Sequence, residues 1–122
     1  MKAPVATEHE EQATVVQYCR LRNIPIFAIP NGTFLAGNAQ RRGGQMKKLK
    51  AEGLTKGIPD LFIPKVTDIF AGCFIEMKRT KGSVTTAEQL AWIKYLNDEG
   101  YYAKICKGAT EAIVTIREYL KK

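Results

Sequence analysis

The chain has 122 residues, 45% hydrophobic and 25% charged, which suits one globular domain over residues 1–122 and argues against gross disorder. Lys and Arg number 19 against 12 Asp and Glu, so the net charge of +7 favours a polyanionic partner, most commonly nucleic acid. No apolar run approaches the roughly 20 residues that span a bilayer, and the charged N-terminus is unlike a signal peptide. We therefore expect a cytoplasmic protein with no membrane partner.

The first predicted element is a helix from Thr7 to about Arg22. Thr7 and Glu10 have the spacing of a capping box, which marks a helix start. The apolar face of this helix comprises Val15, Val16 and Cys19. A strand is predicted over residues 24–29, where β-branched and aromatic side chains dominate, and the Pro-Asn-Gly turn that follows ends it.

A long basic segment follows, over residues 33–57. Five glycines interrupt it, and only a short helix from Gln45 to Ala51 is expected within it. One acidic residue, Glu52, stands against six basic ones: Arg41, Arg42, Lys47, Lys48, Lys50 and Lys56. We therefore predict that these six side chains bind the phosphate backbone of DNA. The glycines lack the Lys-Ser/Thr pair of a P-loop, so no nucleotide or other organic cofactor is expected.

Strands are predicted over residues 60–66 and 73–79, and their connection is too short for a crossover helix, so they should pair antiparallel. A helix then begins at a second capping box, Thr85 to Glu88, and a strand over residues 101–107 leads into a last helix. This order predicts a mixed α/β fold, in which helices flank a small mixed central sheet.

The three cysteines lie far apart, each among apolar neighbours, at Cys19, Cys73 and Cys106. Their number is odd and they form no CxxC pair, so we interpret them as reduced thiols of the core, in an intracellular protein. The single histidine, His9, gives no support for a zinc site or a histidine-based catalytic triad.

The second strand of the hairpin carries the main functional signal. Alternation places Glu76 and Lys78 on one face of it, among apolar neighbours that indicate an interior strand. If the turn centres on Asp68, Asp60 lies across from Glu76, with Cβ atoms roughly 5 Å apart. Two carboxylates that close repel each other unless a cation lies between them. Oxygen ligands, including a backbone carbonyl such as that of Met77, suit Mg²⁺ or Mn²⁺, and Lys78 would assist phosphodiester hydrolysis.

These motifs resemble the VRR-NUC family of the PD-(D/E)xK nuclease superfamily. The matching features are Glu8 with Gln12, Ile29 to Gly32, Gly57 to Asp60, Ile75 to Lys78, and Glu88 with Gln89 shortly before Trp92. The resemblance covers nearly the whole chain and implies a restriction-endonuclease-like core and Mg²⁺- or Mn²⁺-dependent DNA cleavage. For small stand-alone members, from phages or bacteria, it also implies homodimers that act on branched DNA such as four-way (Holliday) junctions.

The resemblance implies two further site residues. A Glu of the first helix would lie near the metal, and Glu8 is the first choice because it shares a helical face with Gln12; Glu11 is the alternative. Either could instead complement the helix dipole. Gln89 would act beside Lys78, although a Gln there could also cap a backbone group. The candidate catalytic set is thus Asp60, Glu76, Lys78, Glu8 and Gln89. For the first three, the alternative is a structural ion-pair network.

The leading interpretation is a structure-selective DNA endonuclease. One alternative is a catalytically inert nuclease fold that only binds nucleic acid. Another is an RNA-directed protein, which would need exposed aromatic side chains for stacking on bases. A restriction-type enzyme that reads bases through Arg41, Arg42 and Gln45 is a weaker alternative.

Overall fold

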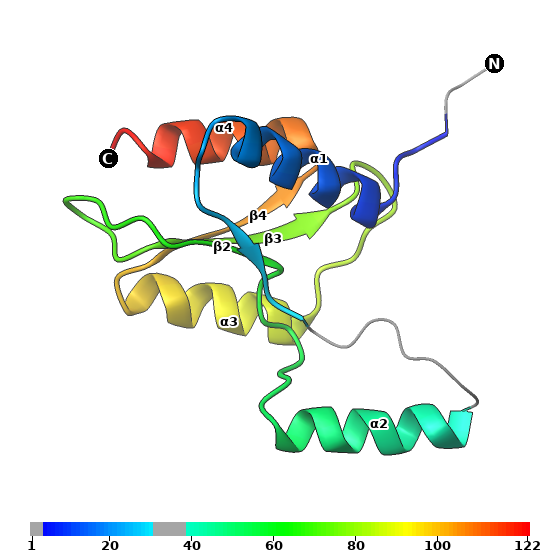
Figure 1. Cartoon of the computed structure of the whole chain (residues 1–122). Coiled ribbons are helices and arrows are strands. Elements are labelled where there is room, and N and C mark those ends of the chain that lie inside the picture. The colour runs from blue at the N-terminus through cyan, green and yellow to red at the C-terminus, as the bar shows by residue number, and fades with distance from the viewer. Residues whose placement is uncertain (1–3, 31–38) are drawn as a thin grey trace.

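Four strands form one mixed sheet in the computed structural model, which describes residues 4–30 and 39–122, with side chains from residue 43 onward in the second range. In spatial order the strands are β1 (Phe27–Ala28), β2 (Leu61–Ile63), β3 (Cys73–Lys78) and β4 (Tyr102–Lys107). The first three pair antiparallel, whereas β3 and β4 pair parallel. Figure 1 shows α1 (Glu8–Leu21) and α4 (Ala109–Tyr119) over one face of the sheet and α3 (Ala87–Asp98) over the other. The predicted fold class is confirmed.

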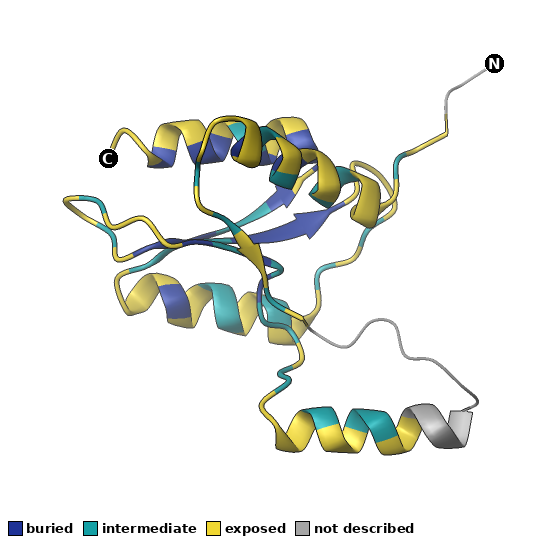
Figure 2. Ribbon diagram, viewed as in Figure 1, coloured by how far each residue is buried: buried dark blue, intermediate teal, exposed yellow. Residues whose placement is uncertain are grey.

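β3 lies at the centre of the molecule, with a strand on each side and helices on both faces (Figure 2). Apolar side chains of α1 and α4, among them Val15 and Ile116, pack against it, and all three cysteines are free, buried thiols, as predicted. Every residue of β3 is buried except Phe74, which is half-buried. Two charged side chains, Glu76 and Lys78, therefore lie in the interior, where each needs a partner.

The first helix begins where the sequence predicts. Thr7 accepts a hydrogen bond from the Glu10 N–H at 3.1 Å, and the Glu10 carboxylate accepts one from the Thr7 N–H at 3.1 Å. With 14 residues, α1 is the longest described helix, and none of the described helices is long and apolar enough to cross a membrane. The strand predicted over residues 24–29 is wrong in length, because only β1 is a strand, although the Ile29 N–H still donates to the Asp60 carbonyl at 2.7 Å. Pro25 and Pro30 lie on either side and offer no N–H to a ladder.

The start of α3 differs by one residue from the prediction. Its capping box joins Thr86 to Gln89, since the Thr86 hydroxyl accepts from the Gln89 N–H at 3.2 Å and the Gln89 amide oxygen accepts from the Thr86 N–H at 2.9 Å. The predicted box from Thr85 to Glu88 is wrong. Glu88 instead lies 3.7 Å from the Lys56 ammonium group, on the outside of the helix.

α2 (Ala39–Ala51) is longer than the helix predicted over residues 45–51, and it projects from the body of the molecule (Figure 1). Among its described side chains, from residue 43 to residue 51, none is buried (Figure 2). Gly43 and Gly44 lie within it with no neighbouring atoms where a Cβ would stand. The helix is therefore a projection with an accessible surface on most sides.

Candidate active site

Asp60 and Glu76 face each other across the hairpin. Leu61 of β2 pairs with Ile75 of β3, which is the predicted register, and one step further along the strands it sets Asp60 opposite Glu76. The Asp60 Oδ2 accepts a hydrogen bond from the backbone N–H of Met77 at 2.7 Å. The carboxylate of Asp60 is thereby fixed against the end of β3 where Glu76 lies.

A third carboxylate joins this pair from the first turn of α1. One oxygen each of Glu8, Asp60 and Glu76 can be chosen so that all three lie within 4.8 Å of one another. The three carboxylates differ in burial: Glu8 is exposed, Asp60 is half-buried and Glu76 is buried. Three oxygen donors at this spacing, open to solvent on one side, can hold one hard cation with room for water ligands.

The structure places Glu8 and Glu11, which the sequence left as alternatives, in different environments. Glu8 points to the other carboxylates, whereas the Glu11 carboxylate accepts a hydrogen bond from the Ala109 N–H at 3.1 Å. α4 starts after Gly108, whose lack of a side chain leaves the first N–H groups of that helix without a cap of their own. A Cβ at Gly108 would lie 2.6 Å from the Glu11 carboxylate, so glycine is required for this contact.

Glu76 has an environment that disfavours its ionised form. It is 2% exposed, and burial, followed by the negative charge of Asp60, raises its pKa to about 9. A hydrogen bond that the protonated group shares with Asp60 raises the pKa further, and the positive charge of Lys78 opposes these effects. When Glu76 is ionised, its buried Oε1 has no hydrogen-bond donor among the described residues. A proton or a cation must therefore compensate this oxygen, and the carboxylate cluster fits a cation.

The other carboxylate oxygen of Glu76, Oε2, has two polar partners. This oxygen lies 3.9 Å from the ammonium group of Lys78 and accepts a hydrogen bond from the Gln89 amide at 3.3 Å. Gln89 is held in turn by its own capping contact with Thr86. Lys78 and Gln89 are thus brought to one side of Glu76, which leaves Oε1 as the unsatisfied oxygen.

Lys78 is anchored by a group that the sequence did not reveal. Its ammonium group donates to the backbone carbonyl of Val84 at 2.9 Å, although the Val84 side chain is exposed. No side-chain pattern marks a carbonyl of this kind. The role of Thr86, in contrast, was detectable, because Thr86 and Gln89 fit the capping-box spacing as well as Thr85 and Glu88 do.

The backbone of Met77 faces the same side as Asp60. In an extended strand the N–H and the C=O of one residue point to the same neighbour, and the Met77 N–H points to Asp60. The next carbonyl, that of Lys78, accepts from the Gly108 N–H at 2.7 Å, on the opposite side. The Met77 carbonyl is therefore directed toward Asp60 and can supply a fourth oxygen.

The predicted DNA-binding residues whose side chains the structure describes lie outside this cluster. Lys47, Lys48 and Lys50 are located on α2, where no described side chain is buried, and Lys56 is exposed on the short connection to β2, next to Glu88. The side chains of the other two, Arg41 and Arg42, lie outside the described residues. The four described cations thus belong to a projecting helix and to the segment that leads from it into Asp60.

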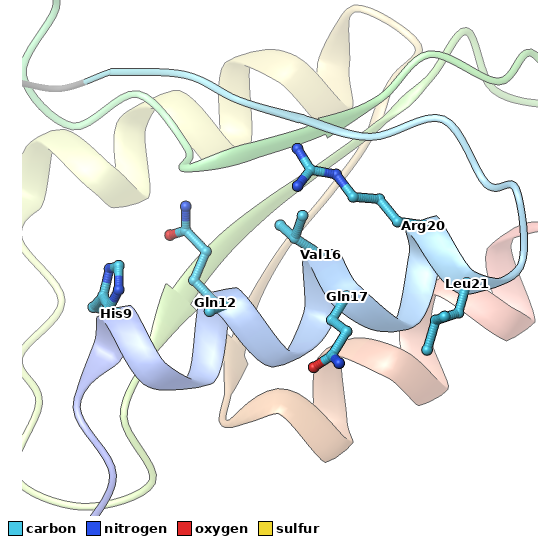
Figure 3. A pocket seen from close by; sticks show the side chains of 7 residues that line it. His9, Gln12, Val16, Gln17, Arg20 and Leu21 are labelled. Carbon is cyan, nitrogen blue, oxygen red and sulfur yellow. The ribbon is translucent and has the colours of Figure 1, made fainter.

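A groove runs along the outer face of α1 (Figure 3). Its volume is about 420 Å³, and its lining includes His9, Gln12, Val16 and Arg20. Figure 3 shows the side chains of Gln12, Val16 and Arg20 on one side of the helix. Gln12 lies one turn after Glu8, so this groove begins beside the exposed end of the carboxylate cluster.

Carboxylates clustered beside a lysine suit the metal-assisted hydrolysis of a phosphodiester. The family model of the VRR-NUC domain matches residues 31–110, and the chain belongs to this family. A solved structure described as a VRR_NUC domain protein superimposes with a TM-score of 0.78 at 28% identity, over 97% of this chain and 91% of that one. No curated protein gives a significant match. Family membership indicates a nuclease, and hence a nucleic-acid substrate.

Proposed function

We propose that this protein is a metal-dependent endonuclease that hydrolyses phosphodiester bonds in DNA. The observation that carries the proposal is the buried Glu76 Oε1, which lacks a donor among the described residues and lies in a cluster with Asp60 and Glu8. We assign Asp60, Glu76 and the Met77 carbonyl as the main ligands of Mg²⁺ or Mn²⁺, with Glu8 completing the set. Carboxylate and carbonyl oxygens are the ligands that these ions prefer.

Each side chain has a separate task in this proposal. A bound divalent ion lowers the pKa of a ligated water and offsets the charge that develops on the phosphate. Lys78, fixed by the Val84 carbonyl, holds a positive charge beside Glu76, where it can orient the attacking water and stabilise the transition state. Gln89 fixes the orientation of the Glu76 carboxylate through Oε2 and keeps Oε1 directed at the cluster.

We further propose that the substrate is DNA and that branched forms, including four-way junctions, are preferred over linear duplex. The lysines of α2 and Lys56 support backbone binding, which is independent of sequence. A symmetric homodimer of this chain, each copy one nuclease domain over residues 1–122, would present two equivalent sites to the two equivalent strands of a junction. An intracellular setting agrees with the three free cysteines.

The deciding experiment compares wild type with Asp60→Asn on supercoiled, linear, flapped and four-way DNA and on RNA of the linear sequence. Each reaction contains Mg²⁺, Mn²⁺ or excess EDTA. We expect DNA cleavage by wild type with either metal, and none in EDTA or by the folded variant, because the variant removes a charged ligand while retaining its shape. Preferential RNA cleavage, or binding without any cleavage, would favour the RNA-directed or the inert alternative.

A further inference from the structure

A second groove, between α2 and the start of α3, adjoins the carboxylate cluster. Its volume is about 330 Å³, at the lower end of the roughly 300–1,000 Å³ typical of small-molecule pockets. On one side lie Met46, Lys50, Leu54 and Lys56, and on the other lie Thr86 and Gln89. Because Gln89 also bonds to Glu76, this α2–α3 groove shares a wall with the proposed catalytic site.

The wall between the groove and the active site is closely packed. Gly57 has φ +88°, and a Cβ there would stand 2.7 Å from the Glu88 Cβ, so the backbone lies directly on the first turn of α3. Lys56, the preceding residue, lies 3.7 Å from the Glu88 carboxylate. A group seated in the groove is therefore held in a fixed relation to Gln89 and Glu76.

The lining has the two chemistries that a nucleotide needs. Met46 and Leu54 are half-buried and apolar, and they offer a surface for the face of an aromatic ring, for which a thioether is well suited. Lys50 and Lys56 line the same groove and complement the phosphates on either side of a base. A base that is paired and stacked in a duplex must first be unpaired and unstacked before it can enter, whereas an unpaired base avoids most of that cost.

We propose that the α2–α3 groove is a subsite for one unpaired nucleobase next to the scissile phosphate, and that it makes the protein selective for DNA with an unstacked nucleotide. This inference rests on the proposed nuclease function, and it supplies a structural origin for preference among DNA forms. A mismatch or a flap offers such a base directly, and a fully paired four-way junction does so only when a base pair at its branch point opens. The recognised feature is therefore local and not the overall branch geometry.

The test uses the fluorescence of 2-aminopurine, which increases when the base leaves the stack. The probe stands unpaired in one duplex and paired in an otherwise identical duplex, and Ca²⁺ replaces Mg²⁺ so that binding is measured without turnover. Met46→Glu introduces a negative charge into the groove. Leu49→Glu is the matched control, because Leu49 is also half-buried on α2 but lines a different surface, with Gln45 and Lys48.

We expect wild type and Leu49→Glu to increase the fluorescence of the unpaired probe and Met46→Glu to lose the increase. With Mg²⁺, Met46→Glu should also show a kcat/KM about tenfold below that of Leu49→Glu on the unpaired substrate, comparable to removing the stacking of one base. No increase with wild type, or equal losses in both variants, would overturn the groove assignment. The fluorescence result is independent of cleavage, so failure of the nuclease proposal, seen as no cleavage of any DNA by wild type, is distinguishable from failure of the groove.

Discussion

Replacing Glu76 by Gln should stabilise the metal-free protein at neutral pH and remove its stabilisation by metal. The folded state raises the pKa of Glu76 from 4.5 to about 9, mainly through burial and the charge of Asp60. A raised pKa means that the folded protein keeps a proton that the unfolded chain releases. The contribution of Glu76 to stability is therefore complete below pH 4.5 and decreases as the pH rises toward 9.

The magnitude follows from the pH interval. Between the unfolded pKa of 4.5 and pH 7 lie about 2.5 pH units, over which the unfolded chain has released the proton and the folded protein has kept it. This interval lowers the free energy of unfolding by about 3 kcal/mol relative to its value at low pH. The glutamine introduced by Glu76→Gln cannot ionise, and its amide can donate to Asp60 as the protonated acid does. In EDTA the variant should therefore be more stable than wild type by up to about 3 kcal/mol at pH 7 and equally stable near pH 4.5. Metal at 100 times its Kd should add about 2.7 kcal/mol to wild type alone.

Urea unfolding between pH 4.5 and pH 8, followed by the fluorescence of Trp92, measures both effects. Trp92 is the single tryptophan and is half-buried on α3, close in sequence to Gln89. The difference in unfolding free energy between wild type and variant reports Glu76 together with its coupling to the neighbouring charged groups, since the remaining groups are the same in both proteins. A difference that stays the same at pH 4.5 and pH 7 would refute the assigned electrostatics of the carboxylate cluster.

Four further outcomes are expected. Excess EDTA should abolish DNA cleavage, and cleavage at an unchanged rate by a preparation free of contaminating nuclease would contradict the metal mechanism. Lys78→Ala should reduce cleavage by at least about 100-fold while DNA affinity changes little, because one cation among 19 is removed from a specific place; gel shift and single-turnover assays separate the two. Replacing Arg41, Arg42, Lys47 and Lys48 by Ala should lower the log–log salt slope of DNA binding by about one unit for each phosphate that is no longer bound, and an unchanged slope would place the DNA elsewhere. Sedimentation at micromolar concentration should give a dimer, and a monomer that cuts linear duplex as fast as a four-way junction would exclude the symmetric arrangement.

The centre of the fold was predictable because it depends on local information. Alternation places Glu76 and Lys78 on one face of β3, and the length of the turn sets Asp60 opposite Glu76. These rules involve neighbours in sequence or across one hairpin. With the turn centred on Asp68, they brought the two central carboxylates together without knowledge of the rest of the chain.

Contacts between distant elements were not predictable in this way. Glu8 and Glu11 are both in the first turns of α1, and only the placement of α4 decides which one faces the cluster. The one-residue shift at the start of α3 has the same origin. Two capping boxes fit the sequence, and the one that forms contains Gln89. The Gln89 side chain accepts from the Thr86 N–H at the helix end and donates to one oxygen of Glu76. α2 extends past two adjacent glycines, although glycine disfavours helix interiors.

The three carboxylates come from two separate parts of the chain. Asp60 and Glu76 lie within residues 31–110, which match the family model. Glu8 precedes them on α1, which packs on the core through Val15 and Cys19 and bonds through Glu11 to the start of α4. The β2–β3 hairpin thus carries two of the carboxylates and Lys78, and α1 contributes the third carboxylate from the solvent side. Such a division is modular: small changes in how α1 packs would change the affinity of the proposed metal site while the hairpin stays unaltered.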